Sequence, residues 1–264
     1  MNLGLNGKLA VVSGSTAGIG LAIAAALAAE GAKVFVNGRT QARVDAALKA
    51  IQQRVAGADL RGVAADLGTS AGVDAFLRQV PAADVLVNNL GIFDVKPFLE
   101  IPDSEWLRFF EVNVLSGVRL SRAYLPEMLK RKWGRIIFIS TESAQQIPAD
   151  MNHNGMTKTA QVAIARGLAE STAGSGVTVN SILAGPTASE GASKFVENMA
   201  KQQNVSPAEI ERQFFQSARP TSLLKRFETP EEVAAVVAFV AGTQAVAING
   251  AAVRAEGGVV RSIF

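Results

Sequence analysis

Short runs of apolar residues, rich in β-branched side chains, alternate along the chain with longer segments whose apolar residues recur at helical spacing. The short runs are almost continuously apolar, as is typical of strands buried on both faces of a parallel sheet. We expect strands at residues 9–13, 33–36, 61–64, 85–87, 135–139, 177–182 and 250–253. We expect helices at residues 20–30, 40–55, 69–80, 103–131, 152–173 and 230–241, with Thr40 as an N-cap.

This alternation predicts a doubly wound α/β fold, in which helices cover both faces of a parallel β-sheet. No repeat, low-complexity linker or change of composition marks a second domain, so residues 1–264 are expected to form a single domain. The least regular stretch is 185–227, which holds helical patterns at 193–203 and 207–218. An insertion beside the carboxyl ends of the strands predicts a substrate lid.

Composition excludes several classes of protein. The chain is 48% hydrophobic and 19% charged, which argues against intrinsic disorder. It has no cysteine and one histidine, His153, so disulfides, a cysteine nucleophile and a multi-histidine metal site are excluded and no metal is expected. Its 26 basic and 23 acidic side chains are scattered, and no basic stripe interleaves with aromatic residues. A nucleic-acid partner is therefore not expected.

The chain also lacks the sequence features of an exported or membrane protein. Residues 1–8 contain no charged segment leading into a long apolar stretch. The longest apolar stretches, 21–29 and 233–241, are shorter than the ~20 residues that cross a bilayer. We therefore expect a cytoplasmic protein without a membrane partner.

A glycine-rich segment, residues 13–20, joins the first expected strand to the first expected helix with the sequence Ser-Gly-Ser-Thr-Ala-Gly-Ile-Gly. Glycines at this junction allow a tight turn and a close approach to a pyrophosphate, and the helix N-terminus offers N–H donors and a positive dipole. The segment predicts dinucleotide binding. The alternative is a glycine-rich turn that binds nothing.

The end of the second expected strand bears on the choice of dinucleotide. It reads Asn37-Gly38-Arg39-Thr40 and has no acidic side chain for the ribose diol of NAD. The guanidinium of Arg39 suits a 2′-phosphate, so NADP(H) is the preferred cofactor. NAD(H) is not excluded, and Arg39 as an ordinary surface charge is the alternative.

Further motifs follow in a fixed order: Asp66, Asn88-Asn89-Leu90-Gly91, Asn113, Gly134-Arg135-Ile136-Ile137, Gly185-Pro186-Thr187 and Glu256-Gly257-Gly258. With the glycine-rich segment they resemble the short-chain dehydrogenase/reductase family over nearly the whole chain. The resemblance implies a Rossmann fold and the interconversion of a carbonyl and an alcohol on a small-molecule substrate. It also implies a homo-oligomer, commonly a tetramer, assembled through the expected helices at 103–131 and 152–173.

The resemblance implies cofactor roles for individual residues. Pyrophosphate contacts fall on Ser13, Gly14, Gly18, Ile19 and Gly20. Adenine contacts fall on Asp66 and Leu67, the cofactor side of the sheet is braced by Asn88 and Gly91, and the nicotinamide carboxamide lies near Thr187 and Ser189. The expected cofactor-binding set is completed by Ser15, Thr16, Asn89, Lys158 and Gly185.

The family's catalytic group is a Ser or Thr, a Tyr, a Lys four residues after the Tyr, and an Asn. Residues at i and i+4 share a helix face, and the ammonium lowers the pKa of the phenol so that it can exchange a proton. By resemblance, Lys158, Thr141 and Asn113 match three of these positions. The fourth, four residues before Lys158, is Asn154 and not Tyr.

This departure leaves three functions open. A neutral amide is not a useful proton donor near pH 7, although it can hold a substrate oxygen or a water. The protein is an oxidoreductase with an altered or disabled proton donor, a scaffold for non-redox acid/base chemistry that uses Lys158 or Glu142, or an inactive nucleotide-binding subunit. Because Lys158, Asn113 and the glycines are all present, the first is favoured. Two other residues could replace the missing proton donor, but neither is favoured. Tyr124 is predicted to be a core or interface aromatic, and His153 to lie on a helix flank or at a subunit contact.

The substrate itself is not defined by the sequence. Candidate apolar lining residues, which could equally pack the lid, are Phe93, Ile147, Met151, Phe195, Phe214 and Phe215.

Overall fold

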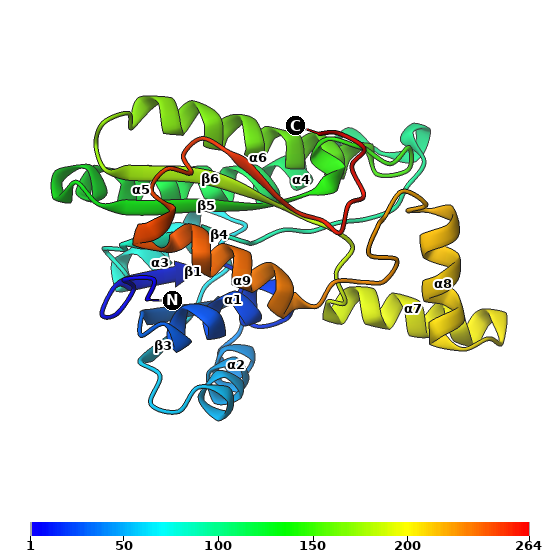
Figure 1. Ribbon diagram of the computed structural model, residues 1–264, viewed down its shortest axis with the longest axis horizontal. Coiled ribbons are helices and arrows are strands. Elements are labelled where there is room, and N and C mark those ends of the chain that lie inside the picture. Colours follow the sequence, from blue (N-terminus) through cyan, green and yellow to red (C-terminus); the bar gives the residue numbers. More distant parts are fainter. Residues whose placement is uncertain (1, 264) are drawn as a thin grey trace.

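The computed structural model describes residues 2–263, without the side chain of Phe195. Its centre is a seven-stranded sheet with the strand order β3-β2-β1-β4-β5-β6-β7, in which all neighbours are parallel (Figure 1). The chain therefore has the doubly wound α/β fold that the alternation of apolar runs and helical patterns predicts. The strands are β1 (Leu9–Val12), β2 (Lys33–Gly38), β3 (Leu60–Ala64), β4 (Val85–Asn88), β5 (Gly134–Thr141), β6 (Val177–Ala184) and β7 (Ala252–Ala255).

Two apolar cores lie on opposite faces of this sheet, because successive strand side chains point to opposite sides. One core joins Ala10 and Val12 of β1 to helices α1 (Gly18–Ala29), α2 (Gln41–Arg54) and α9 (Pro230–Ala241). The other core joins Val11 to the helices of the opposite layer, which are α3 (Ser70–Gln79), α5 (Ser116–Arg131) and α6 (Asn152–Ser171). Near-continuous apolar strands are needed because both faces are covered.

The expected 103–131 helix is interrupted by a π-helical turn. It consists of α4 (Asp103–Phe110), the π turn Glu111–Leu115 and α5. The backbone oxygen of Asn113, inside this turn, accepts a hydrogen bond from Nε2 of Gln161 on α6 at 2.6 Å. The turn contains neither Gly nor Pro, so the sequence pattern did not indicate it.

One local expectation was wrong. The last strand is Ala252–Ala255 and not 250–253, because Gly250 adopts φ +69° and its N–H bonds to the oxygen of Val179, which turns the chain before the strand begins. Thr40 is the N-cap residue of α2, as expected, but its side chain makes no capping hydrogen bond. The remaining elements differ from expectation by a few residues at their ends, where helices and strands are hardest to delimit.

The insertion after β6 holds two helices, α7 (Glu190–Gln203) and α8 (Pro207–Ser217), which stand away from the sheet (Figure 1). Ser189 and Ser206 cap them by accepting hydrogen bonds from Ala192 N and Glu209 N. At its base, Thr187 and Glu228 form an isolated parallel bridge. Residues 188–228 thus leave and rejoin the domain at one point.

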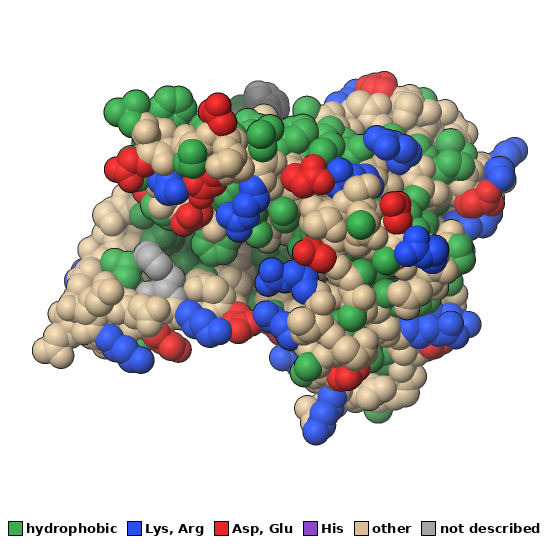
Figure 2. Space-filling view, turned by 180° about the vertical axis from the view of Figure 1, so that it is seen from behind, with side chains coloured by type: hydrophobic (Ala, Val, Ile, Leu, Met, Phe, Trp, Pro, Cys, Tyr) green, Lys and Arg blue, Asp and Glu red, His purple; other side chains and the backbone are tan. Residues whose placement is uncertain are grey.

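The surface carries no continuous stripe of one charge on the face shown in Figure 2, where Lys and Arg side chains are intermingled with Asp and Glu. Within residues 2–263, no helix has the length and apolar character needed to cross a membrane. Among the same residues, no three or more His, Asp or Glu side chains gather in a way that could hold a metal ion.

Candidate functional site

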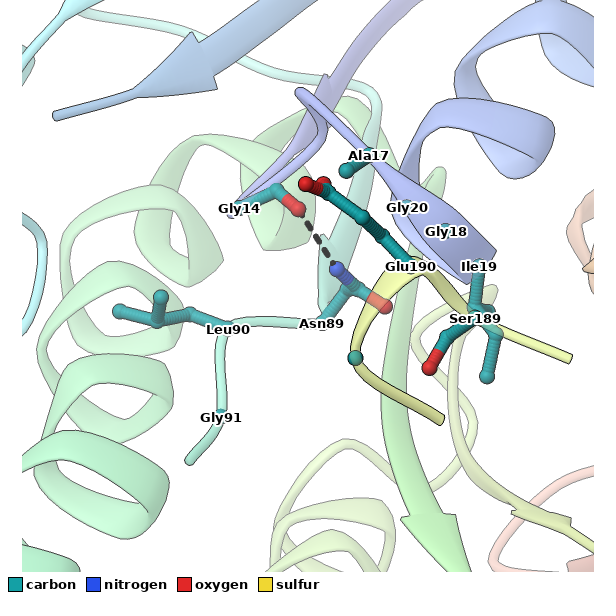
Figure 3. A pocket seen from close by; sticks show the side chains of 11 residues that line it. Gly14, Ala17, Gly18, Ile19, Gly20, Asn89, Leu90, Gly91, Ser189 and Glu190 are labelled. Atoms are coloured by element: carbon teal, nitrogen blue, oxygen red, sulfur yellow. Dashed lines mark hydrogen bonds between the residues drawn. The ribbon is translucent and has the colours of Figure 1, made fainter. Parts of the chain in front are cut away.

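A cavity of about 270 Å³ opens where β1 meets the start of α1, at the carboxyl edge of the sheet (Figure 3). Ala17, at the N-cap position, makes no side-chain capping bond, so the first N–H groups of α1 remain available to an anion. The cavity is lined by Gly14, Ala17, Gly18, Ile19, Gly20, Asn89, Leu90, Gly91, Ser189, Glu190 and Gly191.

The glycines of this turn are required by its geometry. Gly14 and Gly18 have φ +61° and +54°, in the left-handed region that favours glycine. A Cβ on Gly20 would lie 2.4 Å from Nδ2 of Asn89 and 2.5 Å from the oxygen of Gly14. The turn therefore brings bare backbone and helix N–H groups up to the cavity, an arrangement that fits the pyrophosphate of a dinucleotide.

The polar side chains beneath the turn hold it in place. Ser13 is buried, and its hydroxyl accepts hydrogen bonds from Asn89 N and Leu90 N. Nδ2 of Asn89 donates to the backbone oxygens of Ser13 and Gly14 at 3.0 Å each. Ser15, also buried, donates to Val12 O. These side chains hold the glycine turn against the ends of the strands.

The residues expected near the adenosine differ in exposure. Arg39 is exposed at the end of β2, and a Cβ on Gly38 would lie 2.4 Å from Cγ2 of Thr16. Oδ1 of Asp66 accepts a hydrogen bond from Gly68 N at 3.0 Å. Leu67 is 1% exposed in the core, so only its backbone can face a ligand.

Lys158 of α6 and Asn113 of the π turn both approach Gly91, which follows β4 and lines the cavity. A Cβ on Gly91 would lie 3.4 Å from Nζ of Lys158 and 3.5 Å from Oδ1 of Asn113, so glycine here leaves room for both. Asn113 is fixed by hydrogen bonds to both backbone groups of Ile92 and to Oγ1 of Thr157. Nζ of Lys158 donates to Ile139 O at 3.0 Å, and burial lowers the pKa of Lys158 to about 8.

Asn154 is also buried, at 3% exposure, one turn before Lys158 on α6. Its Oδ1 has no hydrogen-bond partner among the described residues. A buried amide oxygen without a partner destabilises the folded state, because it has lost its hydrogen bonds to water. This oxygen is therefore an acceptor available for a ligand or a water.

At the end of β5, Oγ1 of Thr141 accepts a hydrogen bond from Ser143 N at 3.1 Å. The Ser140 hydroxyl donates to Lys158 O, and the Ser143 hydroxyl to Oε1 of Glu142. Of the three hydroxyls, Thr141 is the least enclosed. Glu142 is almost fully buried, and this burial raises the pKa of its carboxyl.

Gly185, Thr187 and Ser189 follow the end of β6. Gly185 N bonds to Ala255 O and to Oε2 of Glu228, and Oγ1 of Thr187 donates to Gly185 O. Ser189 combines the N-cap of α7 with a place in the cavity wall. Burial raises the pKa of Glu228 to about 7.

Two aromatic residues considered from the sequence lie outside this site. Tyr124 is in the core, where its hydroxyl donates to Val80 O at 2.8 Å, as predicted for a core aromatic. His153 is fully buried within the chain, with its ring centroid 4.0 Å from that of Phe109 and 6.0 Å from that of Trp106 on α4. The expectation of a flank or subunit position was therefore wrong, because α4 packs over α6.

The candidate apolar lining residues do not form one wall. Phe214 and Phe215 pack against each other and against Phe227, with ring centroids 5.0 to 5.2 Å apart, which is lid packing. Phe93 and Ile147 are exposed, and Met151 is partly buried just before α6. The side chain of Phe195 lies outside the described part of the chain.

Sequence reasoning missed several residues at the site. Ala17 and Leu90 lie inside the motifs but were assigned no role of their own, and Glu190 and Gly191, which also line the cavity, belong to no recognisable motif. The ion pairs of Arg43 with Glu190 and of Arg219 with Glu142 join segments far apart in sequence, so no local pattern could reveal them. Ser206 and Thr229, by contrast, precede Pro and Glu residues in a way that does indicate helix starts.

Fold and cavity together define a dinucleotide-binding α/β protein, and comparisons with known proteins agree. The short chain dehydrogenase family matches residues 8–200. The uncharacterized oxidoreductase YvaG of Bacillus subtilis is 46% identical over 264 residues, covering 100% of both chains. A D-beta-hydroxybutyrate dehydrogenase of Cupriavidus necator is 34% identical over 258 residues, covering 96% of this chain and 98% of the relative.

Among solved structures, L-sorbose reductase from Gluconobacter frateurii, complexed with NADPH and L-sorbose, superposes with a TM-score of 0.93 at 30% identity over 100% of both chains. The chain belongs to the short chain dehydrogenase family. Its relatives are oxidoreductases.

Proposed function

We propose that this protein interconverts a small carbonyl compound and its alcohol with NADP(H), and that Lys158, not a tyrosine, supplies the proton. The observation that supports the proposal is that Lys158 and Asn113 both approach Gly91 in the wall of the glycine-lined cavity, with the unpartnered, buried amide oxygen of Asn154 one helical turn before Lys158. The nicotinamide ring, when bound, supplies or accepts the hydride.

Carbonyl reduction leaves a negative charge on oxygen that needs a proton. The ammonium of Lys158 has three N–H donors, and one of them is used by Ile139 O within the described part of the chain, so it can donate to a substrate oxygen or to a water next to it. A pKa of about 8 leaves Lys158 protonated near neutrality and within reach of proton transfer. Oδ1 of Asn154 is the acceptor that orients this water or the substrate hydroxyl.

Thr141 provides a second donor to the same oxygen. Its Oγ1 already accepts from Ser143 N, so the hydroxyl proton remains for the substrate. Asn113, held by Ile92 and Thr157, is a positioning residue for this group, since its amide lies beside Lys158.

The preference for NADP(H) over NAD(H) is supported by exposed Arg39 at the end of β2 and by the NADPH in the structure of the sorbose reductase. The described residues at the end of β2, Asn37 to Thr40, contain no carboxylate for the ribose diol. Residues 185–227 act as the substrate lid.

The deciding experiment compares the natural chain with the Asn154→Tyr variant. NADPH and NADH binding is titrated by fluorescence, and turnover is then measured on a panel of aldehydes, ketones and ketoses. A phenol at position 154 would restore the family's proton donor and raise kcat by roughly 10²–10⁴. Asn152→Tyr is the control, because Asn152 lies at the start of the same helix and its side chain donates to Ala149 O.

Binding of NADPH without turnover in either chain would overturn the reductase proposal and favour a non-redox or nucleotide-sensing role. Turnover of the natural chain that is independent of Lys158 would overturn the assignment of the proton donor.

A further inference from the structure

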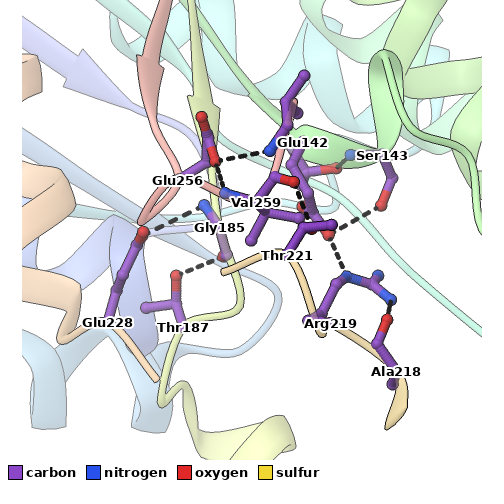
Figure 4. A network of polar contacts seen from close by, with 12 residues as sticks. Glu142, Ser143, Gly185, Thr187, Ala218, Arg219, Thr221, Glu228, Glu256 and Val259 are labelled. Carbon is purple, nitrogen blue, oxygen red and sulfur yellow. Dashed lines mark hydrogen bonds and ion pairs between the residues drawn. The ribbon is translucent and has the colours of Figure 1, made fainter. Parts of the chain in front are cut away.

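A buried ion pair joins the lid to the turn that follows Thr141. Nε of Arg219, just beyond α8, lies 2.9 Å from Oε1 of Glu142, with side-chain exposures of 13% and 6% (Figure 4). Charges removed from water are costly unless they are closely paired, so this contact fixes where the end of α8 can lie. Exposed pairs on the same helix, such as Arg212 with Glu209, impose no comparable constraint.

From this pair, hydrogen bonds lead to the hydroxyl of Thr141. The Ser143 hydroxyl donates to the same Oε1 of Glu142 at 3.3 Å. The Ser143 N–H in turn donates to Oγ1 of Thr141 at 3.1 Å. Arg219, Glu142, Ser143 and Thr141 therefore form one chain of contacts between the lid and the carboxyl end of β5.

On the lid side, Arg219 is tied to α8. Its N–H donates to Phe214 O at 3.0 Å, Nη1 donates to Ala218 O, and its guanidinium carbon is 5.8 Å from the centroid of the Phe214 ring. Phe214 also stacks on Phe227 at the far end of the insertion. The position of Arg219 therefore depends on the packing of the lid helices, since Arg219 is not part of a free loop.

We infer that Arg219 is a positioning residue for the hydroxyl of Thr141: through Glu142 and Ser143, it directs the Thr141 proton toward the substrate oxygen only when the lid is in place. The inference rests on the proposed function, because it assigns Thr141 as a donor to that oxygen. It accounts for a buried charge pair next to the site that neither hydride transfer nor cofactor binding requires.

The first test needs no turnover. Amide hydrogen exchange of residues 142–146 is compared among the natural chain, Arg219→Gln, Arg219→Lys and the control Arg212→Gln. Loss of the ion pair should speed exchange of the Ser143 amide about 10-fold, because the turn loses its anchor. Arg219→Lys should restore part of the protection, and Arg212→Gln should leave it unchanged. Equal exchange in Arg219→Gln and the natural chain would overturn the inference.

The second test is a double-mutant cycle on kcat with Thr141→Val, in the natural chain and in Asn154→Tyr. With Thr141 present, Arg219→Gln should lower kcat about 10- to 100-fold while the Kd for NADPH stays constant. In the Thr141→Val background, where no hydroxyl is left to direct, Arg219→Gln should have no further effect. Additive losses would show a general structural role and overturn the inference.

The two tests separate the inference from the proposed function. Absence of turnover in every background overturns the proposed function, and amide exchange then still decides whether Arg219 orders the turn. If Arg219→Gln does not fold, the same measurements on Glu142→Gln, which removes the other charge of the pair, replace it, and a kcat and an exchange rate identical to those of the natural chain would contradict the inference.

Discussion

Lys158 is a buried ammonium that has one fixed acceptor among residues 2–263, Ile139 O, and its other protons remain for the substrate side. Because burial lowers the pKa of Lys158 to about 8, kcat for carbonyl reduction should be level below that pH and fall tenfold per pH unit above it. A pH–rate profile measures this. Lys158→Gln should lose the dependence and roughly 10²–10⁴ in rate, and a level profile up to about pH 10 in the natural chain would exclude Lys158 as the acid.

Arg39 is the residue on which the choice of dinucleotide depends. Arg39→Ala should weaken NADPH binding by about 10- to 100-fold, the loss expected for a charged hydrogen bond to phosphate, and leave NADH binding nearly unchanged. Titration of both dinucleotides measures it, with 2′,5′-ADP as a probe of the phosphate alone. Arg54→Ala is the control, since Arg54 lies at the end of α2 and pairs with Glu231. Equal losses for NADPH and NADH would contradict a role in specificity.

At the scale of elements, Glu228, at the end of the lid, forms hydrogen bonds with the residues that join β6 to the start of the lid. Its backbone N–H donates to Pro186 O, its backbone oxygen accepts from Ala188 N, and its carboxylate accepts from Gly185 N. The carboxyl is buried next to the strand ends, which raises its pKa from 4.5 to about 7. The folded state therefore binds the proton of Glu228 more tightly than the unfolded state does.

It follows that the free energy of unfolding should fall as the pH rises from about 4.5 to about 7, by at most about 3 kcal/mol from this group. Glu228→Gln keeps an acceptor for Gly185 N but cannot ionise, so it should be more stable than the natural chain at about pH 8 and not at about pH 4. Urea unfolding at both pH values measures this, with exposed Glu231→Gln as the control. A variant that is less stable at about pH 8 would contradict the assignment.

Elements whose hydrophobic pattern is local could be predicted from the sequence, and those created by contacts between elements could not. The strands and α9 follow from continuous apolar runs, and the glycine turn from its position between β1 and α1. The π turn at 111–115 is supported by Gln161 on another helix, and the start of β7 by Gly250 and Val179. The same division holds for the site. Lys158 and Asn113 could be assigned from motifs, whereas the contact between Arg219 and Glu142 could not, because the two residues are 77 positions apart in sequence.

At the scale of the whole molecule, large apolar side chains remain exposed on and before α4. Leu99 is 95% exposed, Leu107 70% and Phe98 58%. Apolar side chains gathered on one surface favour association, and the family resemblance implies contacts through this helix. We expect a homo-oligomer, with a tetramer as the expected state, at micromolar concentration.

Sedimentation velocity tests the assembly. Leu107→Glu should shift it toward smaller species, because a charge is costly at an interface core. Val205→Glu, on the lid between α7 and α8, should leave it unchanged. A monomer in the natural chain would contradict the expectation.

The bridge between Thr187 and Glu228 has a consequence for how the substrate range of this molecule can change. The chain departs and returns at hydrogen-bonded neighbours, Ala188 N and Glu228 O, 2.8 Å apart. The segment between the cavity-lining residues Ser189, Glu190 and Gly191 and the Arg219 ion pair is residues 192–218. Since the entropy of closing such a loop grows only slowly with its length, this segment can be exchanged for a shorter or longer one without moving a strand. Evolution or design can therefore change the substrate specificity by replacing this inserted segment, while the nucleotide-binding sheet stays intact.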